Sequence, residues 1–226
     1  MHGALQFTRL IGRLTPAGVV FLGTGFFIDE KRLVTAAHVV GFDATGIVII
    51  HPKHKSLDDY QDTLDNRHHC TETTVYDIDP IRDLLILELA TAWTKTWSWI
   101  PGLWKPENKN TSLASLDDVS VGQKLNIYGF PHCTDNRNVL THQTTTLGAK
   151  VLLQTSKIKS KHGVLNFQSR PGQSGSPILS ENGEVVALLV GTYVPPGGYV
   201  EVAGTNPASL NQTTHIISAE YIKAML

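Results

Sequence analysis

Short hydrophobic runs recur along the chain, and Gly, Pro, Asn and Asp separate them. The runs are rich in Val, Ile, Leu, Phe and Thr, residues that favour the pleated conformation, so they predict β-strands. A first set comprises Val19–Leu22, Gly25–Ile28, Arg32–Thr35, Gly46–His51, Thr73–Ile78 and Leu84–Leu89. A second set comprises Lys124–Tyr128, Thr144–Leu153, Gly163–Phe167, Ser176–Leu179, Val185–Gly191 and His215–Ser218. Without long helical patterns between them, these strands predict an all-β sandwich or barrel architecture.

Helical patterns are confined to short stretches. Ser218 is placed to cap a helix over Ala219–Leu226, the clearest helical signal in the chain. A single helical turn is expected around Ala36–Val40. The stretch Val194–Thr213 is rich in Pro, Gly, Asn and Thr and predicts a long surface loop.

The stretch 91–112 differs from both strand sets, since it holds all four tryptophans, two prolines and little periodicity. We therefore expect it to connect two units, residues 1–110 and residues 111–226. The tryptophans would either form a contact surface for a partner or pack at the junction of the two units.

Composition narrows the class of protein. The 226 residues carry 19 Lys+Arg against 20 Asp+Glu, and this balance argues against a nucleic-acid binder that neutralises phosphates. No apolar stretch is long enough to span a membrane. Residues 1–15 show no targeting signal, so we expect a cytoplasmic protein; secretion stays open if a leader was removed.

Cysteines and histidines give little sign of a metal or a disulfide. Cys70 and Cys133 are too few for a disulfide scaffold, and we expect two free thiols. The spacing of the histidines in the first half of the chain matches no strong zinc pattern. We expect no metal and no cofactor. The histidines concerned, with Cys70, are His51, His54, His68 and His69.

Three polar residues stand in contexts that suit nucleophilic catalysis. His38 follows two alanines, whose small side chains leave room for its ring. Asp83 stands at the start of an apolar strand, where a carboxylate needs a partner. Ser174 lies between glycines in a tight turn that can present its hydroxyl. A serine nucleophile needs a base, and the base needs an orienting carboxylate, so the three together predict a catalytic triad.

Alternatives exist for two of these positions. Asp77 and Asp79 compete with Asp83, but no apolar strand follows them directly. Ser176 competes with Ser174, but it precedes a proline and lacks the flanking glycines.

The order His, Asp, Ser, with separations of 45 and 91 residues, resembles that of the chymotrypsin-like (trypsin-fold) serine peptidases. The resemblance spans about residues 18–222 and is closest in character to the bacterial HtrA-type and glutamyl-endopeptidase-like branches. The segments that carry it are Gly23–Ile28, Thr35–His38, Asp83–Leu87 and Gly172–Pro177.

This resemblance implies two six-stranded antiparallel β-barrels with the active site between them and a C-terminal helix. The first barrel would supply His38 and Asp83, and the second would supply Ser174. The backbone N–H groups of Gly172 and Ser174 would form the oxyanion hole.

The resemblance also implies which residues bind the substrate side chain. Gln168, Leu189, Val190 and Gly191 would line the S1 pocket, with His215 on a nearby strand. No aspartate stands at position 168, which argues against a preference for Arg or Lys, and Leu189 stands where the glutamyl-specific branch uses a histidine. We expect a small, apolar or uncharged polar P1 residue.

Two departures from the digestive enzymes concern regulation. Val39 replaces the cysteine that follows the histidine in those enzymes, so the disulfide beside the base is absent. Gln173 replaces the aspartate that pairs with a new N-terminal amine after precursor cleavage. We therefore expect no activation by N-terminal cleavage, and control by a regulatory protein partner, a ligand or an assembly instead.

These features predict a serine endopeptidase that acts on protein or peptide substrates and binds neither nucleic acid nor membranes. Two readings stay open beside it. One is a catalytically silent module that uses the trypsin fold to bind peptides; the other is a viral-type polyprotein processing protease.

Overall fold

The structure is a computed structural model, and its description covers residues 7–54, 56–65, 67–90, 111–193 and 213–226. Most of the predicted connection and most of the predicted loop, residues 91–110 and 194–212, lie outside this part of the chain. Trp93, Trp97, Trp99 and Trp104 lie there as well.

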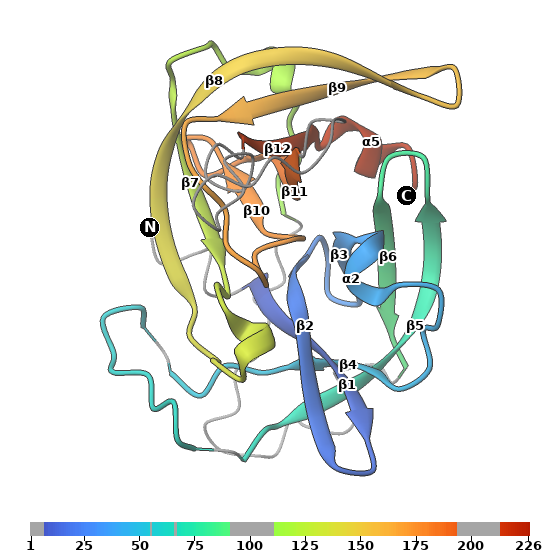
Figure 1. Ribbon diagram of the computed structural model, residues 1–226, viewed down its shortest axis with the longest axis vertical. Helices are drawn as coiled ribbons and strands as arrows, with labels where there is room; N and C mark the ends of the chain where they lie inside the picture. Colours follow the sequence, from blue (N-terminus) through green and yellow to red (C-terminus); the bar gives the residue numbers. More distant parts are fainter. Residues whose placement is uncertain (1–6, 55, 66, 91–110, 194–212) are drawn as a thin grey trace, which may run out of the picture.

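The described strands form two closed antiparallel barrels of six strands each, which confirms the predicted fold class. Figure 1 shows how these strands are arranged in space. The first, in the order β1-β2-β3-β6-β5-β4, consists of β1 (Thr8–Thr15), β2 (Gly18–Phe27), β3 (Arg32–Ala36), β4 (Ile47–Ile50), β5 (Cys70–Asp79) and β6 (Leu84–Leu89). The second, in the order β10-β11-β12-β9-β8-β7, consists of β7 (Lys124–Gly129), β8 (Thr141–Thr155), β9 (Ile158–Leu165), β10 (Pro177–Leu179), β11 (Val185–Tyr193) and β12 (Thr213–Ser218).

Two predictions within the first barrel are wrong. The strand β1 was not expected, and β2 is one continuous strand where two short strands were predicted. The pattern hides β1 because Arg9, the second residue of this strand, is fully buried, with its guanidinium 5.3 Å from the ring of Phe27. A buried arginine breaks the alternation of apolar and polar residues that normally marks a strand.

Helices are short, and the C-terminal one is shorter than predicted. The turn α2 (Ala37–Val40) lies where a helical turn was expected, and two 3₁₀ turns, η1 (Leu116–Asp118) and η2 (Cys133–Asp135), lie in the second half. The helix α5 covers only Glu220–Lys223. Ser218 does not cap it: Ser218 ends β12, and its hydroxyl accepts a hydrogen bond from the backbone N–H of Leu116 at 3.1 Å.

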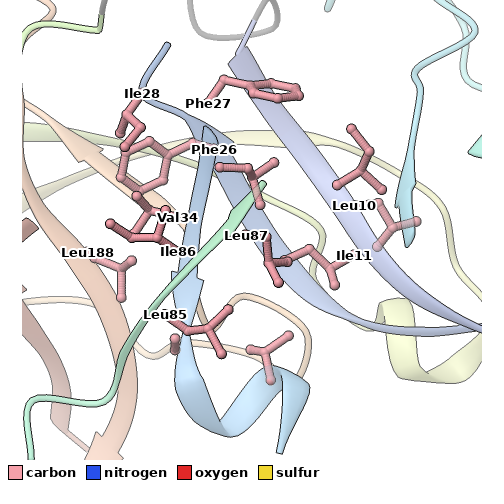
Figure 2. Packing of buried hydrophobic residues seen from close by; sticks show 14 of the residues in the cluster. Leu10, Ile11, Phe26, Phe27, Ile28, Val34, Leu85, Ile86, Leu87 and Leu188 are labelled. Carbon is pink, nitrogen blue, oxygen red and sulfur yellow. The ribbon is translucent and has the colours of Figure 1, made fainter. Parts of the chain in front are cut away.

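The core of the first barrel continues into the interface with the second. Figure 2 shows Phe26, Val34 and Ile86 of the first barrel packed together near Leu188 of β11, and Leu188 belongs to the same buried cluster. The second barrel also has a separate core, which includes Leu189 and Ile216. The shared apolar interface fixes the two barrels relative to each other, because separating them would expose these side chains to water.

Cys70 and Cys133 are free thiols, as predicted. Within the described residues, no helix is long and apolar enough to cross a lipid bilayer. The same residues contain no group of three or more His, Cys, Asp or Glu side chains placed to hold a metal ion.

Candidate active site

His38 and Asp83 form a tightly hydrogen-bonded pair in the first barrel. The Nδ1 atom of His38 lies 2.6 Å from Oδ2 of Asp83, and the other carboxylate oxygen accepts the backbone N–H of His38 at 2.8 Å. A carboxylate accepts only, so Nδ1 carries the proton and Nε2 keeps its lone pair for a substrate or a nucleophile. The contact therefore sets both the orientation and the tautomer of the imidazole.

The position of Asp83 depends on an unusual backbone conformation. Its φ angle is 57°, in the left-handed region that aspartate tolerates better than most residues. In this conformation its carbonyl oxygen accepts the N–H of Ala37 at 3.0 Å, while its side chain turns to His38. The turn between β5 and β6 and the start of α2 are thus joined by both the main chain and the side chain of one residue.

The alternative carboxylates are engaged elsewhere. Asp79 binds the guanidinium of Arg82 at 2.6 Å and accepts the N–H groups of Ile81 and Arg82. Asp77 accepts the N–H of Ile78 at 2.8 Å. Of Asp77, Asp79 and Asp83, Asp83 is the one that the structure places against His38.

The loop that carries Ser174 lies between β9 and β10 and is held from across the barrel interface. Thr24 of β2 donates its backbone N–H to the carbonyl oxygen of Ser174 at 3.0 Å and its hydroxyl to that of Gly172 at 2.8 Å. The same hydroxyl accepts the N–H of Phe130 at 3.1 Å. Thr24, the centre of the Gly-Thr-Gly motif, thus links the first barrel to two segments of the second.

The residues on either side of Ser174 face the protein interior. Gln173 is fully buried; its side-chain oxygen accepts the N–H of Arg170 at 2.7 Å, and its amide nitrogen donates to Gln143 at 2.8 Å. Ser176 is also fully buried, and no hydrogen-bond partner for its hydroxyl lies among the described residues. Ser174 alone of these three is only partly buried.

The turn before Ser174 leaves two N–H groups available. Gly172 has a φ angle of 90°, and the carbonyl oxygen of Pro171 accepts the N–H of His132 at 2.6 Å. Within the described residues, the N–H groups of Gly172 and Ser174 donate no hydrogen bond. Two such N–H groups in one turn can bind a negatively charged oxygen.

Ser174 and His38 line one cavity of about 480 Å³. The hydroxyl of Ser174 donates to the carbonyl oxygen of Val190 at 3.2 Å. Three of the predicted substrate-binding residues, Val190, Gly191 and His215, line this cavity too. Two others do not: the side chain of Leu189 is buried in the core of the second barrel, and Gln168 is exposed outside the cavity lining.

Sequence reasoning missed two residues of the cavity, Leu153 of β8 and His162 of β9. His215 pairs with Val164, and His162 lies two residues from Val164, so both histidines project from the same face of neighbouring strands. The strand register was the missing information. Had the pairing of His215 with Val164 been known, the position of His162 two residues from Val164 would have placed His162 on the same face as His215.

Comparison with known proteins adds to this geometry. Residues 23–188 match the trypsin-like peptidase domain family. Similar solved structures include the active form of the Rv3671c protease from M. tuberculosis, with a TM-score of 0.62, 18% identity, and coverage of 99% of this chain and 80% of that chain. The MamO protease domain from Magnetospirillum magneticum gives a TM-score of 0.67 at 12% identity, with 100% of this chain and 98% of that chain covered.

The HtrA-type protease AlgW, solved with a decapeptide, gives a TM-score of 0.64 at 14% identity, covering 99% of this chain and 64% of that chain. No curated protein matches the sequence. At these identities the structural matches show the fold alone. The family match covers residues 23–188, more than half of the chain, and therefore shows the family. The chain belongs to the trypsin-like peptidase family.

Proposed function

We propose that this peptidase is a serine endopeptidase in which His38, Asp83 and Ser174 form the catalytic triad. The observation that carries the proposal is the 2.6 Å contact between His38 Nδ1 and the Asp83 carboxylate, at the rim of a cavity that also contains Ser174. Protein and peptide substrates are the expected class, and the AlgW structure with a bound decapeptide is consistent with a peptide-binding cleft in this fold.

Acylation begins when the hydroxyl of Ser174 exchanges its hydrogen bond to Val190 for one to Nε2 of His38. Oγ then attacks the carbonyl carbon of the scissile bond while His38 takes the hydroxyl proton, and Asp83 stabilises the imidazolium that forms. His38 returns the proton to the amine as the C–N bond breaks.

Deacylation repeats these steps with water as the nucleophile. His38 removes a proton from water, the hydroxide attacks the ester, and Ser174 recovers its proton as the acid product leaves. In both steps the N–H groups of Gly172 and Ser174 would bind the tetrahedral oxyanion. Loss of one such donor typically lowers the turnover number by about 10²–10³.

The buried amide of Gln173 supports activity without precursor cleavage. A buried carboxylate at this position would need a cation, such as a new N-terminal amine, because an unpaired buried charge is costly. Gln173 is neutral, and its amide group is hydrogen-bonded inside the second barrel. No charge is left for an amine to neutralise.

Labelling with a fluorophosphonate probe tests the proposal, because such probes react with an activated serine. We expect the wild-type protein to be labelled at Ser174, and Ser174→Ala to give no labelling and lose at least about 10⁴-fold in peptide cleavage. Equal labelling of both proteins, or none of the wild type, would instead favour a catalytically silent peptide-binding module.

A further inference from the structure

We propose that Arg82 and Tyr221 position Asp83, the acid of the proposed triad. The guanidinium of Arg82 lies between the carboxylate of Asp79 and the ring of Tyr221, and we call these three residues the arginine clamp. The clamp keeps the turn before Asp83 in the conformation that directs its carboxylate at His38. This inference rests on the proposed function, since it concerns the orientation of the proposed base.

The guanidinium of Arg82 is held from two sides. Its Nη1 atom lies 2.6 Å from Oδ2 of Asp79, and its central carbon lies 4.4 Å from the centroid of the Tyr221 ring. The attraction between a cation and the face of an aromatic ring is stronger where water is excluded. Only 25% of the Arg82 side chain is exposed, so both contacts hold it in place.

The arginine clamp acts on the backbone because the carboxylate of Asp79 binds the turn itself. Its Oδ1 atom accepts the N–H groups of Ile81 and Arg82 at 3.0 and 3.1 Å, while its Oδ2 atom binds the guanidinium. One carboxylate thus fixes both the main chain and the side chain of Arg82, the residue directly before Asp83.

Asp83 needs such support. Its φ angle of 57° lies in the left-handed region, which costs free energy in a residue with a side chain and persists where the surrounding contacts impose it. The N–H of Ala37 binds the carbonyl oxygen of Asp83, and the arginine clamp holds the chain just before it. If the turn relaxed, the carboxylate would leave the N–H and the Nδ1 atom of His38.

Tyr221 reaches the turn from the C-terminal helix α5, which Figure 1 shows beside the turn between β5 and β6. Ala219 and Ile222 belong to the buried cluster that contains the core of the first barrel, so this helix is anchored on that barrel. The hydroxyl of Tyr221 accepts the N–H of Lys161 of β9 at 2.8 Å. The ring and the hydroxyl therefore have different partners and can be tested separately.

A second arrangement of the same kind supplies a control. Asp29 accepts the N–H groups of Lys31 and Arg32 and binds the guanidinium of Arg32 at 2.6 Å. That guanidinium lies 5.2 Å from the centroid of the Tyr76 ring. This turn leads from β2 into β3 and not to Asp83, so loss of the Tyr76 ring should leave catalysis unchanged.

The test compares Tyr221→Leu, which removes the ring, with Tyr221→Phe, which removes only the hydroxyl. We expect Tyr221→Leu to lower kcat by about three- to tenfold, the range that corresponds to one cation–π contact. KM should change by less than about twofold, because the cavity lining does not include the arginine clamp. Tyr221→Phe and the control Tyr76→Leu should keep kcat within about twofold of wild type.

A second measurement separates positioning from stability. The NMR resonance of the His38 Nδ1 proton, which lies in the 2.6 Å contact with Asp83, should be displaced in Tyr221→Leu and unchanged in Tyr221→Phe and Tyr76→Leu. Arg82→Met removes the charge and keeps an unbranched side chain. It should act like Tyr221→Leu, and it carries the test if Tyr221→Leu does not fold, which urea denaturation shows.

Combining Arg82→Met with Tyr221→Leu should lower kcat no further than the single change with the larger effect, because both remove the same contact. Full additivity of the two losses would mean that Arg82 and Tyr221 act separately and would overturn the inference.

The outcomes separate the two proposals. If Tyr221→Leu folds and keeps the wild-type kcat or the wild-type His38 resonance, or if Tyr221→Phe or Tyr76→Leu loses as much activity, this inference is overturned and the proposed function stands. If fluorophosphonate does not label the folded wild type, the proposed function fails. The His38 resonance then decides by itself whether the arginine clamp positions Asp83.

Discussion

The two halves of the candidate site are held in different ways. His38 and Asp83 are fixed by contacts within one stretch of the first barrel, where the backbone and side chain of Asp83 bind Ala37 and His38. The loop of Ser174 is instead held across the interface, where Thr24 of the first barrel binds both Ser174 and Gly172.

The proposed acid–base pair is thus held locally within the first barrel, whereas the proposed nucleophile, Ser174, is placed by the docking of both barrels. Disturbing the contacts of Thr24 should therefore misplace Ser174 while the histidine–aspartate pair stays intact.

The largest effect is expected from Gly175→Ala. Gly175 has a φ angle of 85°, and a Cβ atom there would overlap the carbonyl oxygen of Thr24. Gly183 is the matched control, since its φ angle is 82° but nothing lies within 4 Å of an added Cβ. We expect Gly183→Ala to lower the free energy of unfolding by about 1–2 kcal/mol, the cost of the left-handed conformation alone.

Gly175→Ala carries the same backbone cost plus the overlap, so we expect it to lose at least about 2 kcal/mol more. Its rate of fluorophosphonate labelling should fall by at least about 100-fold, because the overlap moves the loop that carries Ser174. Urea denaturation measures the first quantity. Equal losses in the two variants would show that the interface does not constrain this loop.

A smaller effect is expected from Thr24→Val, which keeps the shape of the side chain and removes its hydroxyl. The carbonyl oxygen of Gly172 and the N–H of Phe130 would both lose a buried partner. We expect a loss of about 1–3 kcal/mol in stability and a fall in kcat of about tenfold or more, because Gly172 belongs to the proposed oxyanion hole.

Thr8→Val is the control for this change. Thr8 is also buried, but no hydrogen-bond partner for its hydroxyl lies among the described residues, so its replacement should change neither stability nor kcat appreciably. The NMR resonance of the His38 Nδ1 proton, which lies in the 2.6 Å contact with Asp83, should be the same in Thr24→Val and wild type. A displaced resonance would mean that the two halves of the site are not held independently.

Much of the fold was predictable because most strands carry their own apolar signal and the motifs are local. The number of strands in the first barrel nevertheless came out right through two errors that cancel: β1 was missed and β2 was divided in two. Arg9 caused the first, since a fully buried arginine in a strand has no sequence signature.

Site residues that stand in a local sequence motif were predictable. Site residues that reach the cavity only through the register of paired strands were less so. His38, Asp83 and Ser174 stand in recognisable motifs. Leu189 and its neighbour Val190 alternate between core and cavity, so a shift of one residue reverses which of them meets a substrate. His162 enters the cavity through the pairing of β9 with β12, which no local pattern records.

The smallest effect is expected from Ser176→Ala, which compares two serines of one turn, Ser176 in the interior and Ser174 at the cavity. Ser174 faces the cavity, whereas Ser176 lies in the interior against Gly129, with its hydroxyl buried and without a partner among the described residues. Removing an unsatisfied buried hydroxyl leaves no group stranded, so stability should stay within about 0.5–1 kcal/mol of wild type.

Fluorophosphonate labelling of Ser176→Ala should proceed at the wild-type rate, since the contacts that Thr24 makes with Ser174 and Gly172 do not involve the Ser176 hydroxyl. Loss of labelling in this variant would assign the reactive hydroxyl to Ser176 and would require the loop to turn its other face to the cavity. Because Gln173 and Ser176 are both fully buried, that rearrangement would have to expose two side chains that the second barrel now encloses.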